Sequence, residues 1–315
     1  MKRVILVMIS MALLFSLSGC GGNENSLRVG TWKTAQTIQP FFYEDYISDK
    51  EIEIIPFTNP GDMKTALLSG SLDMCGSTLV TAITARSKGE SVVVLTGLSN
   101  GCSAFVVKKD SGIKEVKDFK GKKIAYVPGT MHHLLLLEAL EQGGLNPEED
   151  VELIRIDFFD MGQALKQGDI DAFYSGEPYP AMAVLEGYGE ILLYPDDETG
   201  FGTINSVMIT TQDMIEENSE VIEELVYAHH RATVMLNYDK EAWIDKSLEF
   251  GVAEDVLDLS MENIDLFWDI DEAYIKRVEK LAIRMKEQGM IEEIPDIRAM
   301  FFTDYVDDIR EEYEE

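Results

Sequence analysis

The chain has 315 residues, roughly twice the ~150 residues typical of one domain, so two lobes or domains are expected. Apolar residues make up 45% and charged residues 27%, which excludes a disordered chain, a collagen and a multi-span membrane protein. The 58 acidic residues outnumber the 27 basic ones, for a formal net charge of −31. So few basic residues cannot assemble a phosphate-binding face, and nucleic acid is excluded as an expected partner.

The N-terminal segment indicates export. Lys2 and Arg3 precede an apolar stretch over residues 4–17. At ~1.5 Å of rise per residue this stretch cannot cross a ~30 Å hydrocarbon core as a helix. Length and flanks therefore predict a signal peptide over residues 1–19 and not a membrane anchor.

The end of this segment predicts a lipid anchor. The sequence Leu17-Ser18-Gly19-Cys20 resembles the bacterial lipobox, whose cysteine is acylated and becomes the mature N-terminus. Cys20 is the predicted lipidation site (a diacylated, palmitate-type anchor), and residues 20–26 are a polar tether. Acyl chains would hold the protein on the extracytoplasmic face of the cell membrane. The alternative is a chance cysteine in an uncleaved leader.

The first half of the chain alternates between strand-like and helix-like segments. Strands are expected over residues 27–30, 52–55, 72–75, 91–98 and 104–107, and helices over 38–47, 62–68 and 78–86. The run Val92-Val93-Val94-Leu95 is typical of a strand that is covered on both faces.

The second half repeats the alternation and then becomes helical. Strands are expected over residues 123–127, 151–156, 170–174, 190–194 and 204–211, and helices over 131–142, 161–167 and 178–186. From residue 212 the pattern is helical to the end, with apolar faces over 220–236 and 273–286. Repeated β–α units with short connections predict an α/β protein with parallel-rich sheets.

Several segments together resemble a known family. Residues 57–76 read FTNPGDMKTALLSGSLDMCG and residues 113–128 read IKEVKDFKGKKIAYVP. Gly129-Thr130 then opens a leucine-rich helix, and ALKQGDIDA over 164–172 leads into Glu177-Pro178-Tyr179. In this order and spacing the segments resemble the solute-binding lipoproteins of nitrate, sulfonate and taurine ABC importers. Thiamine-precursor-binding proteins belong to the same broad group.

The resemblance implies a two-lobed type II periplasmic binding protein fold with a ligand cleft between the lobes. We expect residues 27–107 plus 207–315 in lobe 1 and residues 108–206 in lobe 2, with crossings near Phe105 and Val207. It also implies a monomer without enzymatic activity or cofactor, which captures a small molecule and delivers it to the transmembrane subunits of an ABC permease.

The same resemblance, with the chemistry of the side chains, selects candidate ligand-binding residues. Helix N-termini and the loops that precede them expose free N–H groups and capping hydroxyls to a ligand. Each candidate also has a structural explanation, such as an N-cap for the threonines and a turn for the Asn-Gly pair. The candidates are Trp32, Lys33, Ser77, Thr78, Asn100, Gly129, Thr130, His132, Glu177, Tyr179 and Asn205.

Cysteine and histidine give no evidence of redox or metal chemistry. Cys75 and Cys102 could form a disulfide or remain two buried thiols. Adjacent histidines in a helix point about 100° apart, so neither His132-His133 nor His229-His230 can chelate one ion well. We expect no metal site, and we expect His229 to be a core residue.

The ligand stays open at this stage. A small organic anion such as a sulfonate could be held by helix N-termini and Lys33. A thiamine-precursor pyrimidine or a similar heterocycle could instead stack on Trp32 and bond Glu177. A biosynthetic enzyme on the same fold is less favoured, because the local signatures of zinc proteases, serine hydrolases and dinucleotide enzymes are absent. A component that presents ligand to a membrane sensor is a further alternative.

Overall fold

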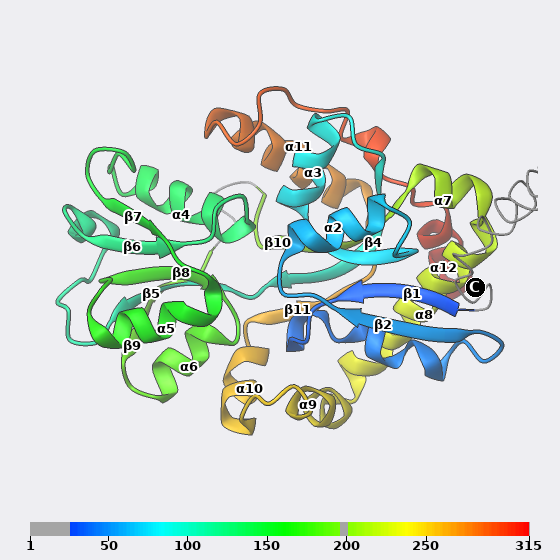
Figure 1. Ribbon diagram of the computed structural model, residues 1–315, viewed down its shortest axis with the longest axis horizontal. Coiled ribbons are helices and arrows are strands. Elements are labelled where there is room, and N and C mark those ends of the chain that lie inside the picture. The colour runs from blue at the N-terminus through cyan, green and yellow to red at the C-terminus, as the bar shows by residue number, and fades with distance from the viewer. Residues whose placement is uncertain (1–25, 196–200, 315) are drawn as a thin grey trace, which may run out of the picture.

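The strands of the protein form two sheets that lie side by side (Figure 1). The computed structural model describes residues 26–195 and 201–314, so the predicted signal peptide, Cys20 and the tether before Ser26 lie outside the described residues. The first sheet has the order β11-β4-β10-β3-β1-β2, and the second β7-β6-β8-β5-β9. The strands are β1 (Ser26–Thr31), β2 (Glu51–Pro56), β3 (Met74–Thr78), β4 (Val92–Gly101), β5 (Ser103–Lys108), β6 (Lys123–Tyr126), β7 (Glu152–Arg155), β8 (Ala172–Gly176), β9 (Gly189–Leu193), β10 (Ile204–Thr211) and β11 (Ile264–Leu266).

Helices cover both faces of each sheet. The α-helices are α2 (Pro60–Leu68), α3 (Leu79–Ser87), α4 (Met131–Gln142), α5 (Phe158–Gln167), α6 (Tyr179–Leu185), α7 (Gln212–Glu217), α8 (Ser219–Tyr238), α9 (Lys240–Leu248), α10 (Glu254–Met261), α11 (Glu272–Glu287) and α12 (Asp304–Glu314). Short 3₁₀ helices are η1 (Ala35–Thr37), η2 (Gln39–Asp45), η3 (Val116–Phe119) and η5 (Arg298–Met300).

The chain passes between the sheets twice. Cys102 is the single residue between β4 and β5, and its φ of 60° is a left-handed conformation that side chains rarely adopt. The return connection lies between β9 and β10. The expected lobe limits at 107 and 207 fall inside β5 and β10. Pairing within the second sheet already begins at Ser103, and pairing within the first sheet resumes at Ile204. The division into lobes at those limits stays a prediction.

The apolar run in β4 is buried on both faces, as its sequence predicts. Val92 and Val94 pack into one core with α3 and α11, whereas Val93 and Leu95 pack into another with η2 and α8. Successive side chains of a strand point to opposite faces, so an uninterrupted apolar run requires helices on both. In the second sheet, α4 covers one face, and α5 and α6 cover the other.

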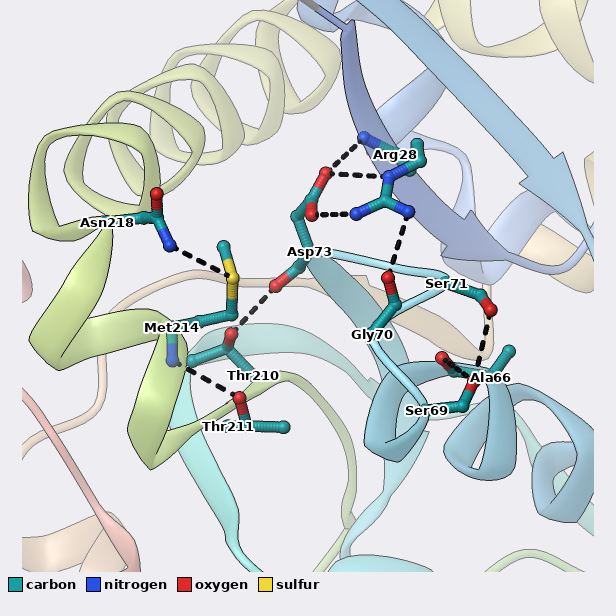
Figure 2. A network of polar contacts seen from close by, with 10 residues as sticks. All are labelled: Arg28, Ala66, Ser69, Gly70, Ser71, Asp73, Thr210, Thr211, Met214 and Asn218. Carbon is teal, nitrogen blue, oxygen red and sulfur yellow. Dashed lines mark hydrogen bonds and ion pairs between the residues drawn. The ribbon is translucent and has the colours of Figure 1, made fainter. Parts of the chain in front are cut away.

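An ion pair between buried Asp73 and partly exposed Arg28 joins three strands of the first sheet (Figure 2). Asp73, just before β3, accepts hydrogen bonds from the Arg28 backbone N–H at 2.7 Å and from its guanidinium at 2.5 Å. Arg28 also donates to the Gly70 carbonyl at 2.9 Å. The Thr210 hydroxyl donates to the Asp73 carbonyl at 2.7 Å, so β1, β3 and β10 are joined at one residue.

Three expectations about secondary structure are wrong. Within the α-helix expected over residues 38–47, Gln39–Asp45 form a 3₁₀ helix, because the aromatic run after Pro40 has low α-helix propensity. The helical tail contains β11, a three-residue edge strand that is too short to give a pattern. Asn100 and Gly101 end β4 and do not form a turn between strands.

Candidate ligand cleft

The direction of the strands shows which edge of each sheet faces the other sheet. β2 and β3 run parallel to β1, and β3 and β4 are both antiparallel to β10. Since β4 leads directly into the second sheet, the carboxyl ends of β1 to β4 all face that sheet. In the second sheet Ser103, the first residue of β5, pairs with Gly176, the last residue of β8. β6 and β7 run parallel to β8, so their carboxyl ends face the first sheet.

The predicted ligand residues lie at these two facing edges. In the first sheet, Trp32 and Lys33 follow β1, Ser77 and Thr78 end β3, and Asn100 is near the end of β4. In the second, Gly129, Thr130 and His132 follow β6, whereas Glu177 and Tyr179 follow β8; Asn205 is on the returning strand β10. Ligands of open α/β sheets bind outside the carboxyl ends of the strands. The ligand role of these residues stays a prediction.

Two helices begin at these edges with a threonine N-cap. Thr78 Oγ1 accepts the Thr81 N–H at 3.2 Å and Thr130 Oγ1 accepts the His133 N–H at 3.2 Å. The Thr130 hydroxyl itself donates to the Val127 carbonyl at 2.8 Å. Both hydroxyls are therefore engaged in capping, and the first N–H groups of α3 and α4 are the better ligand donors.

Trp32 packs against β3, the strand that leads directly into α3. A Cβ placed on Gly76 would lie 3.0 Å from the Trp32 ring, so glycine lets the indole approach the backbone of β3. Trp32 is half-buried and Ser77 is buried, with its hydroxyl donating to the Thr78 carbonyl at 3.1 Å. Lys33 is exposed. The first lobe thus offers an aromatic face and one exposed cation.

Glu177 and Asn205 meet at Cys102, the residue at which the chain crosses from the first sheet to the second. The Asn205 amide donates to the Gly101 carbonyl at 3.1 Å and to Cys102 Sγ at 2.8 Å, and the Glu177 N–H donates to the Cys102 carbonyl at 2.7 Å. Both side chains are at least 95% buried. Asn205 therefore fixes the crossing, and Glu177 joins it to the loop after β8.

The Glu177 carboxylate is buried with few donors. Its Oε2 accepts the Ala181 N–H at 3.1 Å and its Oε1 accepts the Asn263 amide at 3.3 Å. Burial raises the pKa of Glu177 to about 7, although these hydrogen bonds act in the opposite direction. Near neutral pH this group can therefore either accept a hydrogen bond from a ligand or donate one.

His132 is buried and neutral. Burial lowers its pKa to about 4, so at pH 7 it supplies no positive charge to an anion. Its Nδ1 is 2.9 Å from the Ser103 hydroxyl, and its ring lies over Gly176, where an added Cβ would be 2.9 Å from the ring. The ring also meets Phe158 edge-on at 5.3 Å between centroids.

Several residues at the same edges were missed by the sequence analysis. Phe158 follows β7, and its ring is nearly parallel to that of Tyr179, with centroids 6.4 Å apart. Phe57 follows β2 and is partly buried. The rule that loops after parallel strands line the cleft would have identified both. Asn263 bonds Glu177 from the helical tail, and no sequence pattern pointed to it.

Asn100 departs most from the expected arrangement. Its side-chain amide donates to Asp265 on β11 at 3.3 Å, so its nitrogen is used within the first sheet. The amide oxygen has no hydrogen-bond partner and is buried. Asn100 remains near the crossing but is held toward the edge strand.

The other cysteines and histidines of the described ranges form neither a disulfide nor a metal site. Cys75 and Cys102 are free and buried, so of the two sequence alternatives the buried thiols hold. Among the described residues no group of three or more His, Cys, Asp or Glu side chains is placed to hold a metal ion. His229 is fully buried with Nδ1 2.8 Å from the Tyr43 hydroxyl, which agrees with its expected core role. Within the described ranges, no helix combines the length and apolar character that crossing a membrane requires.

A cavity of about 660 Å³ lies elsewhere, between the ends of α4 and α11. Arg284, Gln288 and Glu141 line it, and none of the predicted ligand residues does. Arg284 Nε donates to buried Glu138 of α4 at 3.0 Å, and its NH2 group contacts Glu141 at 2.5 Å. These bonds join α11, which packs on the first sheet, to α4 of the second sheet.

Comparison with other sequences identifies the family of this protein. Residues 43–242 match the family described as NMT1/THI5 like. The chain is 27% identical over 224 residues to the "Putative aliphatic sulfonates-binding protein" of Escherichia coli, which covers 70% of this chain and 67% of that protein. A shorter stretch of 122 residues is 31% identical to the 4-amino-5-hydroxymethyl-2-methylpyrimidine phosphate synthase of Schizosaccharomyces pombe, covering 38% and 34% of the two chains.

Solved structures share the fold at low sequence identity. The periplasmic aliphatic sulphonate-binding protein SsuA from Escherichia coli superposes with a TM-score of 0.77 at 22% identity, over 89% of this chain and 93% of that one. The periplasmic nitrate-binding protein NrtA from Synechocystis PCC 6803 gives 0.70 at 18% identity, over 88% and 85%. The protein thus has the two-lobed α/β fold of periplasmic binding proteins. It belongs to the NMT1/THI5-like family.

Proposed function

We propose that this protein is the extracytoplasmic binding component of an ABC importer, which captures one small molecule between its lobes and delivers it to a permease. One observation carries the proposal: the loops after the parallel strands of both sheets meet at the inter-lobe edge and hold the predicted ligand residues. The family, and the names of the relatives that match most of the chain, support a binding role over catalysis.

The proposed ligand is a small organic anion such as a sulfonate. The N-termini of α3 and α4 supply N–H groups and the positive ends of two helix dipoles, and Lys33 supplies a charge. A Glu177 carboxyl that is protonated near neutral pH can donate a hydrogen bond to an anionic oxygen. The name of the sulfonates-binding relative points in the same direction.

A second ligand class is favoured by the buried acid itself. An ionised Glu177 carboxylate accepts hydrogen bonds from an amino group, and Trp32 provides a ring face on which a heterocycle stacks. A thiamine-precursor pyrimidine or a similar heterocycle has both features. The two classes therefore differ in the protonation state of Glu177 that they select.

Native mass spectrometry of protein purified without denaturation, followed by a thermal-shift screen, tests the function. The screen contains ethanesulfonate, taurine and nitrate against 4-amino-5-hydroxymethyl-2-methylpyrimidine. A ligand at 100 times its Kd adds ~2.7 kcal/mol of stability. Binding without turnover supports the proposal, and chemical conversion of a bound compound would replace it by the enzyme alternative.

The pH dependence of Kd separates the two ligand classes. Binding of an anion that needs the protonated acid weakens from pH 6 to pH 8, because the pKa of Glu177 lies between these values. Binding of the neutral aminopyrimidine strengthens over the same range. Glu177→Gln should remove the dependence in either case; a dependence that persists in this variant would assign it to another group.

Substitutions at the cleft test hinge closure. Moving the closed population from 1:99 to 99:1 requires roughly 10⁴-fold tighter binding to the closed state, and only groups from both lobes supply that difference. Trp32→Ala and Glu177→Ala should each weaken binding of the same ligand at least ~10-fold. Tyr238→Ala, at an aromatic ring that is 89% exposed, is the control. Loss of ligand-free stability at unchanged affinity would make both residues structural.

We also propose that acylated Cys20 holds the protein at the membrane surface, close to the permease. Cys20→Ala should release unacylated protein from the membrane fraction. A variant that is still acylated and membrane-bound would disprove the lipid anchor but not ligand binding. Permease and ATPase genes beside the coding gene would favour the importer over the sensor alternative.

A further inference from the structure

Asn263 contacts the hinge from the helical tail of the chain. It lies between α10 and β11, beyond the residues 43–242 that define the family match. Its carbonyl accepts the Cys102 N–H at 2.6 Å, and its amide Nδ2 donates to the Ser103 carbonyl at 3.3 Å and to Glu177 Oε1 at 3.3 Å. One side chain of the first lobe thus bonds the start of β5 and the acid after β8.

The surroundings of Glu177 make this contact important. The carboxylate is 3% exposed, and none of the ion pairs within the described ranges includes it. The titratable groups around it are the buried Cys102 thiol and Tyr194, which also interacts with Glu262. His132, whose Nδ1 is 2.9 Å from the Ser103 hydroxyl, is neutral. Hydrogen-bond donors, and not cations, therefore hold this carboxylate in place.

Those donors come from different parts of the fold. The Ala181 N–H belongs to α6 in the second lobe, so it moves with Glu177. Asn263 belongs to the first lobe, and α10 just before it packs against α6. Ser260 of α10 is a further hydrogen-bonding group that lowers the pKa of Glu177, with a smaller effect than Asn263. Asn263 and Glu177 stand on different lobes, so their hydrogen bond can fix the carboxylate only while the two lobes keep the relative position seen in this structure.

We propose that Asn263 is a positioning residue of the ligand site: it holds the Glu177 carboxylate at the hinge and ties its orientation to the relative position of the lobes. The consequence for binding rests on the proposed function, because it requires Glu177 to contact the ligand. The positioning itself does not, since it concerns contacts within the ligand-free protein.

Asn263→Ala is a clean perturbation. It removes the amide donor but keeps the backbone carbonyl that accepts the Cys102 N–H. A carboxylate that loses a donor is less stable in its charged form, so its pKa rises. Asn263→Asp keeps the size, removes the donor and adds a negative charge, so the pKa should rise further. Asn237→Ala is the matched control, because Asn237 donates to the Leu266 carbonyl at 3.0 Å and does not bond Glu177.

The test is a carbon-13 NMR titration of carboxyl-labelled glutamate in the ligand-free full chain, with the Glu177 signal assigned by Glu177→Gln. The midpoint should rise by about half a pH unit or more in Asn263→Ala, a ~3-fold fall in the proton dissociation constant, and more in Asn263→Asp. Asn237→Ala should leave it unchanged. A midpoint that does not move in a folded Asn263 variant, or that moves equally in Asn237→Ala, overturns the proposal.

The ligand screen separates this inference from the proposed function. With ethanesulfonate or the aminopyrimidine as the probe, Asn263→Ala should weaken binding and shift the pH profile of Kd toward higher pH by the same amount as the NMR midpoint. If affinity falls but the midpoint of the pH profile of Kd stays the same, Asn263 has a structural role and does not position Glu177, which overturns the proposal. Absence of binding by every probe, with the NMR shift present, would count against the proposed function alone.

Discussion

The Arg284–Glu138 contact should contribute strongly to stability because it joins the two lobes and one partner is buried. Arg284 Nε donates to both carboxylate oxygens of Glu138 at 3.0 and 3.1 Å, and Gln288 donates to Glu138 at 3.3 Å. The side chain of Glu138 is 7% exposed and that of Arg284 is 25% exposed. Removing one partner of a buried pair costs about 3–5 kcal/mol, and partial exposure of Arg284 reduces this to about 2–3 kcal/mol.

A double-mutant cycle measures the interaction. We expect Arg284→Met to lower the free energy of unfolding by about 2–3 kcal/mol, and the cycle with Glu138→Gln to give a coupling free energy of about 2 kcal/mol. The measurement is urea unfolding followed by circular dichroism. The coupling should survive 0.5 M NaCl, because salt screens buried charges less than exposed ones.

The control is a pair of similar chemistry on the surface. Arg298 and Glu272 form a forked contact within the first lobe, and both side chains are about half exposed. Their cycle should give a smaller coupling that falls in salt. Equal couplings for the two pairs, or a value below about 0.5 kcal/mol for Arg284 and Glu138, would refute the idea that burial makes the inter-lobe contact strong.

Three further predictions concern the cleft and the first sheet. Between pH 4.5 and about 7 the folded protein keeps a proton on Glu177 that the unfolded chain has released, so the free energy of unfolding falls as pH rises. The stability of Glu177→Gln relative to the wild type should therefore increase by about 2 kcal/mol from pH 5 to pH 8 in urea unfolding. A difference that does not change with pH would contradict the raised pKa. Gly76→Ala should displace Trp32, whose ring is 3.0 Å from the added Cβ, and weaken ligand binding measured by calorimetry; unchanged affinity would place the indole outside the site. Asp73→Ala leaves the Arg28 N–H without an acceptor and its guanidinium with only the Gly70 carbonyl. Because Arg28 is partly exposed, we expect a loss of about 1–2 kcal/mol of stability in urea unfolding, and a shift of less than about 0.5 kcal/mol would disprove this.

Local patterns in the sequence determined most of the elements. The helix over residues 131–142 and the strand over 204–211 match the sequence prediction residue for residue, because periodicity and the glycines or threonines at their ends define them. The continuous apolar run in β4 correctly predicted burial on both faces. The order of such segments was also enough to indicate the family, which residues 43–242 confirm.

Tertiary structure decided what no local pattern contains. The three-residue strand β11 exists because it pairs with β4, and Asn263 beside it reaches Glu177 across 86 residues of sequence. The neutral state of His132 and the raised pKa of Glu177 follow from burial, which depends on how segments of both sheets pack around the crossing at Cys102. The family resemblance and side-chain chemistry therefore selected the candidate groups that lie at the facing edges of the sheets, whereas their charge and hydrogen-bond partners were set by contacts between segments far apart in the chain.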